Sequence, residues 1–163
     1  MSIPASIFKA YDVRALYPGE LDETAARAIG RAFVAYLGAS RIAVSRDMRL
    51  SSPSLSAAFI DGALEQGADV VDYGMCATDM LYFGVVRDGL DGGAQITASH
   101  NPGQYNGIKM VRAEAFPLSG DAGIGEIRDM VTGGAIPAPT RPRGTHEHVD
   151  LLDDYAARVL GFI

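Results

Sequence analysis

The sequence predicts an α/β domain with a mixed, mainly parallel sheet sandwiched between helices. Apolar runs that suit buried strands alternate along the chain with segments of helical spacing, and glycine or proline stands at most of the junctions. Strands that alternate with helices imply right-handed crossovers, which leave neighbouring strands parallel. A chain of 163 residues is also long enough to enclose one hydrophobic core.

The first two helices and the strand between them are marked by spacing and by end signals. Apolar residues recur on one helical face up to Gly38, which stands where a left-handed residue often ends a helix. A short apolar run (RIAVS) then suits a buried strand, and Ser52 and Pro53 suit the N-cap and first turn of the next helix. We therefore expect helices over 21–37 and 52–66, and a strand over 41–45.

The same alternation continues with one change of direction. Residues 69–74 (DVVDYG) and 92–99 (GGAQITAS) suit strands, and Thr78 suits the N-cap of a short helix between them that ends near Val86. The strand over 107–112 (GIKMVR) follows a loop too short to hold a crossover helix. We expect it to pair antiparallel with the strand before it, which makes the sheet mixed.

The pattern becomes irregular beyond Gly120. A further helix is expected to end near Val131, and residues 133–150, which contain three prolines, suit an extended connector. Helical spacing returns over 149–160, and the sequence then stops on two apolar residues. Because natural termini are usually polar and loosely held, we expect that more protein follows.

Composition excludes several classes of function. The net charge is −6 and no stretch is rich in lysine and arginine, which argues against a nucleic-acid partner. No apolar run approaches the ~18 residues of a membrane span, and no N-terminal signal segment is present. The single cysteine, Cys76, has no partner within the chain for a disulfide. We therefore expect a cytoplasmic protein with no membrane partner.

The most informative segment is residues 96–110 (ITASHNPGQYNGIKM), where a strand runs into a loop that contains Ser99. Ligands of open α/β sheets bind beyond the carboxyl ends of the strands, which is where this loop lies. The Asn-Pro-Gly turn exposes the serine and can direct backbone N–H groups at an anion. Lys109 returns on the following strand and can place a positive charge near a group held by Ser99. Phosphate chemistry suits this combination.

The Ser99-His100 pair allows two other interpretations. A lone Ser99-His100 pair in a loop is most often only turn chemistry. A hydrolase nucleophile would sit in a G-x-S-x-G elbow, but Ala98 and His100 flank the serine here. Adjacent side chains in an extended chain point to opposite sides, so we expect His100 to support the site rather than to activate Ser99 directly.

The motifs TASHNP and YNGIK resemble the phosphoserine loop of the α-D-phosphohexomutase family. The N-terminal SIFKAYDVR resembles its phosphomannomutase/phosphoglucomutase branch, and the resemblance extends over nearly the whole chain. It implies that Ser99 carries a phosphate and that Arg14 and Lys109 lie beside it. It also implies that Tyr11 contacts the sugar and that His100 shapes the loop.

The resemblance implies a reaction and its cofactors as well. Members interconvert hexose 1-phosphate and hexose 6-phosphate through a hexose 1,6-bisphosphate, with Mg²⁺ bound at the phosphoserine. This chain has no Asp-x-Asp spacing, so Ser99, through its phosphate, is the metal ligand that we expect it to supply. The remaining metal ligands are expected in other domains of the same parent chain.

The resemblance also sets the domain boundaries. Residues 1–146 correspond to the phosphoserine-bearing first domain, and 147–163 to a connector and the first helix (VDLLDDY) of a truncated second domain. We expect this chain alone to be inactive. Two alternatives stay open: a phosphoglucosamine mutase domain, against which FKAYDVR argues, and a stand-alone phosphosugar-binding module without catalysis.

Overall fold

A six-stranded mixed sheet forms the centre of the computed structural model, which describes residues 3–163. The four strands in the order β4-β2-β3-β6 are parallel, whereas β5 runs antiparallel to both β4 and β1. The antiparallel pairing of β4 with β5 confirms the expected change of direction. In chain order the strands are β1 (Val13–Leu16), β2 (Arg41–Arg46), β3 (Asp69–Met75), β4 (Gly92–Ile96), β5 (Tyr105–Arg112) and β6 (His146–His148).

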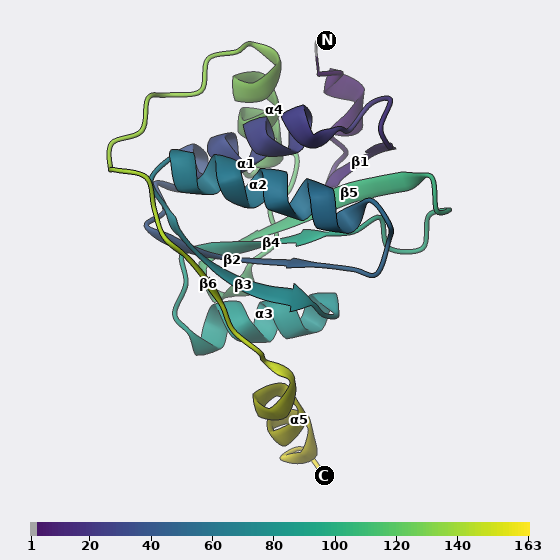
Figure 1. Ribbon diagram of the computed structural model, residues 1–163, viewed down its shortest axis with the longest axis vertical. Helices are drawn as coiled ribbons and strands as arrows, with labels where there is room; N and C mark the ends of the chain where they lie inside the picture. The colour runs from purple at the N-terminus through teal and green to yellow at the C-terminus, as the bar shows by residue number, and fades with distance from the viewer. Residues whose placement is uncertain (1–2) are drawn as a thin grey trace.

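Helices cover both faces of the sheet, as Figure 1 shows. Two long helices and a shorter one lie on one face, and a single helix covers the other, so the expected α/β sandwich is confirmed. The last helix projects away from the sheet beyond α3 (Figure 1). In chain order the helices are α1 (Glu23–Leu37), α2 (Ser52–Glu65), α3 (Thr78–Arg87), α4 (Ile124–Thr132) and α5 (Leu152–Leu160), with 3₁₀ turns at Ala5–Ile7 and Ala113–Ala115.

The helix ends follow the sequence signals, with two corrections. The Asp22 side chain accepts a hydrogen bond from an N–H of the first turn of α1, and Gly38 ends that helix at a φ of 60°. Ser52 and Thr78, however, are the first helical residues of α2 and α3 and not their N-caps. The Ser52 hydroxyl instead donates to Asp47 at 2.5 Å, so it is engaged outside the helix.

Two strands, β1 and β6, were not predicted from the sequence. β6 lies within the stretch expected to be an extended connector, and it pairs with β3 over three residues. All three residues of β6 are exposed, so no apolar alternation marks this strand in the sequence. β1 has only four residues, and it pairs antiparallel along β5. Its position matters because it brings the N-terminal segment to the loop that follows β4.

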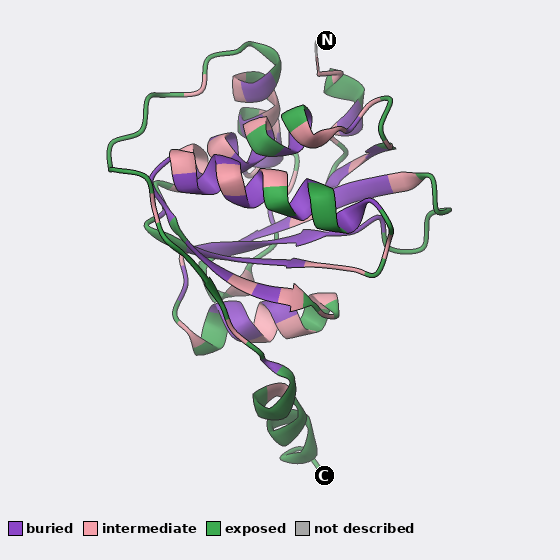
Figure 2. Cartoon of the chain, in the orientation of Figure 1, coloured by how far each residue is buried: buried purple, intermediate pink, exposed green. Residues whose placement is uncertain are grey.

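The hydrophobic core has two parts, one on each face of the sheet. The larger lies under α1, α2 and α4 and includes the fully buried rings of Phe33 and Phe59, whose centroids are 5.9 Å apart. The smaller lies under α3 around Leu81 and Val85. Figure 2 shows the buried strands between these layers and the exposed surface of α5, which has no buried residue. Among the helices of residues 3–163, none has the length and apolar character needed to cross a membrane.

Candidate active site

The Ser99 loop lies between β4 and β5, at the edge of the sheet where the parallel strands end. Ser99 is exposed and has a φ of 55°, a left-handed conformation that is uncommon for a residue other than glycine. Such a conformation costs on the order of 1–3 kcal/mol and persists only where surrounding contacts hold it. The Ser99 N–H donates to Thr97 Oγ1 at 2.9 Å, which is one of these contacts.

His100 lies closer to the serine than the sequence interpretation allowed. Its Nδ1 is 3.1 Å from Ser99 Oγ, within hydrogen-bond distance. The expectation that the two side chains point to opposite sides was wrong, because it assumed an extended chain. The positive φ of Ser99 turns the backbone and brings both side chains to one side. A proton can therefore pass between the hydroxyl and the imidazole.

A cluster of charged side chains reaches the same loop from β1 and β5. Arg14 on β1 donates through Nη1 to the carbonyl oxygen of Ala98, directly before the serine. Its Nε and Nη2 bind Asp12 Oδ2 at 3.0 and 2.7 Å, and Lys109 Nζ on β5 lies 3.4 Å from the same oxygen. The structure therefore gathers both predicted cations around one carboxylate, and Arg14 joins this cluster to the loop.

Tyr11 precedes this cluster in the chain and lies largely in solvent. Its side chain is 71% exposed, next to the buried Asp12. The ring is accessible to a ligand, and its expected contact with a sugar stays a prediction.

Comparison with known proteins assigns the family. Residues 5–135 match the model of the phosphoglucomutase/phosphomannomutase alpha/beta/alpha domain I. The chain belongs to this family. The part of the chain that matches the phosphoglucomutase/phosphomannomutase model includes both the N-terminal motif with Arg14 and the Ser99 loop.

Two relatives of this phosphoglucomutase/phosphomannomutase domain are named phosphomannomutase. A phosphomannomutase of Escherichia coli is 41% identical over 158 residues, which are 96% of this chain and 34% of that protein. A phosphomannomutase sequence of Klebsiella pneumoniae is 43% identical over 150 residues, 91% of this chain and 95% of that sequence.

A crystal structure of a phosphoglucomutase/phosphomannomutase family protein from Burkholderia thailandensis has a TM-score of 0.88 and 36% identity, and the match covers 98% of this chain and 36% of that one. The chain therefore spans about a third of the length of the first relatives it matches.

Three charged residues that contact the site were not predicted from the sequence as site residues. Asp12 anchors Arg14 and Lys109, and Asp47 and Arg49 lie directly after β2, where they contact the Ser99 loop. A usable signal was present, because β2 and β4 are parallel neighbours and their carboxyl ends meet at one edge of the sheet. Charged residues at the end of β2 were thus candidates for the same site.

Cavities on both sides of the loop expose it to ligands. One of about 520 Å³ lies between Ser99 and the segment after β2, and its rim includes the exposed Met48 and Leu50. Another of about 630 Å³ extends past Arg14 and Asn101. The site is therefore open to solvent on both sides of the loop.

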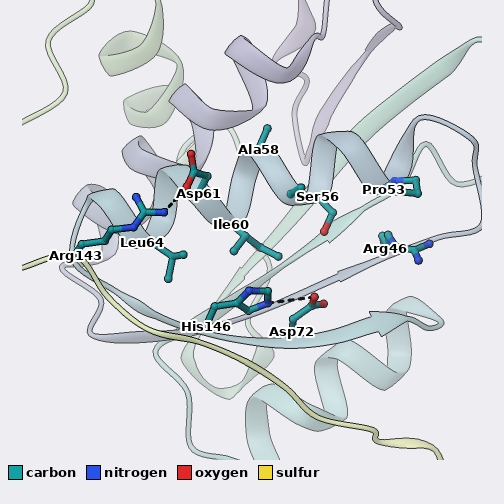
Figure 3. Close-up of a pocket in the computed structure, with 11 residues that line it drawn as sticks. Arg46, Pro53, Ser56, Ala58, Ile60, Asp61, Leu64, Asp72, Arg143 and His146 are labelled. Carbon is teal, nitrogen blue, oxygen red and sulfur yellow. Dashed lines mark hydrogen bonds and ion pairs between the residues drawn. The ribbon is translucent and has the colours of Figure 1, made fainter.

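A further cavity of about 630 Å³ lies between α2 and β6, away from the serine (Figure 3). Two pairs of side chains contact each other in it: His146 Nε2 lies 3.3 Å from Asp72 Oδ2, and Arg143 contacts Asp61. None of the predicted site residues lines it. We assign no substrate to this cavity.

Residues 3–163 offer a metal ion few ligands. No three histidine, cysteine, aspartate or glutamate side chains within this part of the chain converge on a common point. Asp12, the carboxylate nearest the cations, is already engaged by Arg14 and Lys109. A phosphate on Ser99 would present the oxygen ligands that Mg²⁺ prefers, so the expected metal role of Ser99 is chemically compatible with this site.

Proposed function

We propose that this chain is the serine-bearing domain of a phosphomannomutase/phosphoglucomutase, which interconverts hexose 1-phosphate and hexose 6-phosphate. The observation that carries the proposal is the position of Ser99. Its hydroxyl is exposed at the end of a parallel strand, 3.1 Å from His100 Nδ1, and the adjacent carbonyl is bound by Arg14. The family assignment and the names of the relatives support the same activity.

In the proposed mechanism, phosphorylated Ser99 donates its phosphoryl group to the free hydroxyl of a hexose phosphate. The bond between phosphorus and Ser99 Oγ breaks as the bond to the sugar oxygen forms, the proton of the sugar hydroxyl passes to a base, and Ser99 Oγ takes up a proton, which gives a hexose 1,6-bisphosphate. The bisphosphate then turns over in the site and returns its other phosphoryl group to Ser99. The product is the isomeric monophosphate, and the enzyme is again phosphorylated.

The charged side chains have separate roles in this scheme. Arg14 and Lys109 stabilise the negative charge of the phosphoryl group during transfer, as preorganised cations do in such reactions. His100 Nδ1 lies within hydrogen-bond distance of Ser99 Oγ, where it can return a proton to the oxygen when the phosphoryl group leaves. Tyr11, exposed beside this cluster, is proposed to contact the sugar.

Mg²⁺, when bound, would supply further stabilisation of phosphoryl charge, and the phosphate on Ser99 would hold it from this chain. The other ligands, the determinants of sugar choice and the clamp on the second phosphate are proposed to lie in other domains of the parent protein. The Escherichia coli and Salmonella typhimurium phosphomannomutases are about three times as long as this chain, which supports that division. We accordingly propose that residues 1–163 alone do not catalyse the conversion of hexose phosphates. We also propose that the parent enzyme is cytoplasmic.

The test is to locate the phosphate. The full-length enzyme is incubated with a hexose 1,6-bisphosphate, and intact and peptide mass spectrometry identifies the modified residue. We expect one phosphate on Ser99, none on Ser99→Ala, and an unchanged result for Ser54→Ala, which alters an exposed serine on α2. A phosphate on Ser45, Ser51 or Ser52 instead would overturn the assignment.

A further inference from the structure

Arg49 binds the Ser99 loop from the side opposite to the predicted cations. Its guanidinium donates to four backbone carbonyl oxygens of the loop and its exit. The acceptors are the carbonyl oxygens of Ser99 (3.0 Å), Asn101 (2.6 Å), Pro102 (2.9 Å) and Tyr105 (3.1 Å). Arginine has five N–H donors in one rigid plane, so a single side chain can fix several peptide groups at once.

Asp47 joins Arg49 to the other side of the serine. Arg49 Nε donates to Asp47 Oδ2 at 3.0 Å, and the hydroxyl of Thr97 donates to the same oxygen at 2.8 Å. Thr97 Oγ1 in turn accepts the Ser99 N–H at 2.9 Å. The N–H and the C=O of Ser99 are therefore tied into one closed circuit of hydrogen bonds that runs through Asp47 and Arg49.

This circuit explains how Ser99 keeps its left-handed backbone. A residue with a Cβ leaves a φ of 55° readily unless the peptide groups on both sides are held. Arg49 and Asp47 do so from within the protein, since their side chains are only 12% and 16% exposed. With the carbonyl groups drawn toward Arg49, the Ser99 hydroxyl stays on the side of His100.

We propose that Arg49 is a positioning residue for phosphoryl transfer, which holds the Ser99 loop in the conformation that presents the hydroxyl. The inference rests on the proposed function, because it assigns Arg49 a role in the same reaction. Arg49 does not touch the phosphoryl group in this proposal. It acts through the backbone, so its loss affects the rate of transfer and not the affinity for the sugar.

The first experiment measures the loop in the 163-residue chain and requires no activity. Amide hydrogen exchange is compared in wild type, Arg49→Lys and the control Arg46→Lys. Lysine keeps the charge but cannot reproduce the planar fork. The Arg46 side chain makes a single long hydrogen bond, 3.4 Å to the carbonyl oxygen of Asp47, and it is a matched control at the end of β2, three residues before Arg49.

We expect the exchange of the Ser99, Asn101 and Tyr105 amides to rise at least tenfold in Arg49→Lys and to stay unchanged in Arg46→Lys. The β4 amides should keep wild-type protection in both variants, which shows that the fold is intact. If Arg49→Lys does not fold, Arg49→Gln takes its place. Wild-type exchange of the loop amides in the folded variant would overturn the inference.

The second experiment measures catalysis in the full-length enzyme. We expect kcat of Arg49→Lys to fall by about 10- to 100-fold, because small displacements of a reacting group have effects of that size, while KM changes less than about threefold. Added guanidinium should partly restore kcat of Arg49→Ala and leave wild type unaffected. A raised KM with an unchanged kcat, or no rescue of folded Arg49→Ala, would overturn the positioning role.

The two experiments also separate this inference from the proposed function. A wild-type enzyme that takes no phosphate on Ser99 would overturn the proposed function, and the catalytic role of Arg49 would fall with it. An enzyme that is phosphorylated on Ser99 but tolerates Arg49→Lys at full kcat would overturn the role of Arg49 alone.

Discussion

Replacement of Asp12 by asparagine tests whether one carboxylate organises both cations of the site. Asp12 Oδ2 receives Arg14 Nε and Nη2 at 3.0 and 2.7 Å and faces Lys109 Nζ at 3.4 Å. The side chains are 11%, 17% and 30% exposed in the order Asp12, Arg14, Lys109, so solvent screens the cluster only in part. Asparagine keeps the shape but removes the charge that offsets two cations.

The expected loss follows from these contacts. A hydrogen bond to a charged group contributes about 1.5–3 kcal/mol, and the amide oxygen of asparagine can still accept one of them in weaker form. Partial exposure lowers the value further. We therefore expect Asp12→Asn to lower the free energy of unfolding by about 2 kcal/mol, which corresponds to about 4–8 °C in Tm for a domain of this size.

Urea denaturation of the 163-residue chain, followed by circular dichroism, measures this difference. The matched control is Asp129→Asn, which removes the exposed pair with Arg128 on α4 and should leave stability unchanged. A loss for Asp12→Asn no larger than that of the control would refute the reasoning. In the full-length enzyme the same variant should also lower kcat, because the shared anchor of Arg14 and Lys109 is gone.

Three further predictions address the mechanism, the packing and the pH dependence. Lys109→Ala in the full-length enzyme should lower kcat more than it raises KM, because the charge acts mainly while the phosphoryl group moves; an unchanged kcat excludes this role. Gly62→Ala should lower the free energy of unfolding by about 2 kcal/mol, since its Cβ would collide with the backbone of α1, whereas Gly19→Ala meets no atom within 4 Å and should be neutral. Similar urea midpoints for these two variants would contradict the packing argument. Partial burial raises the pKa of Asp91, but hydrogen bonds from the backbone N–H groups of Ser40 and Arg41 and from the Ser40 hydroxyl together outweigh burial and hold the pKa below its ordinary value of 3.8. Because the pKa of Asp91 is lower in the folded than in the unfolded protein, the ionised carboxylate stabilises the fold fully above the ordinary pKa, and this stabilisation is lost as the pH falls through the folded pKa. On acidification from about pH 5 to about pH 2.5, Asp91→Asn should therefore lose less free energy of unfolding than wild type. Equal losses in the two proteins would argue against this role of Asp91.

The sequence by itself determined the layers of this fold and the position of its candidate nucleophile. Apolar runs and helical spacing are local signals, and each long helix and each buried strand carries its own. The change of direction between β4 and β5 followed from loop length alone, which forbids a crossover. The apolar run over 92–98 placed Ser99 at the end of a strand. The motifs TASHNP and YNGIK around it indicated the family that residues 5–135 match.

Only the tertiary structure decided how the residues around Ser99 meet. Asp12 and Lys109 are 97 positions apart, and Arg49 reaches carbonyl groups 50 to 56 positions away, so no local pattern connects them. His100 was misplaced because its direction depends on the φ of one residue, which contacts distant in the chain enforce. β6 stayed hidden for a related reason. β6 pairs with β3 through backbone groups, and its exposed polar side chains show no apolar pattern from which a strand could be predicted.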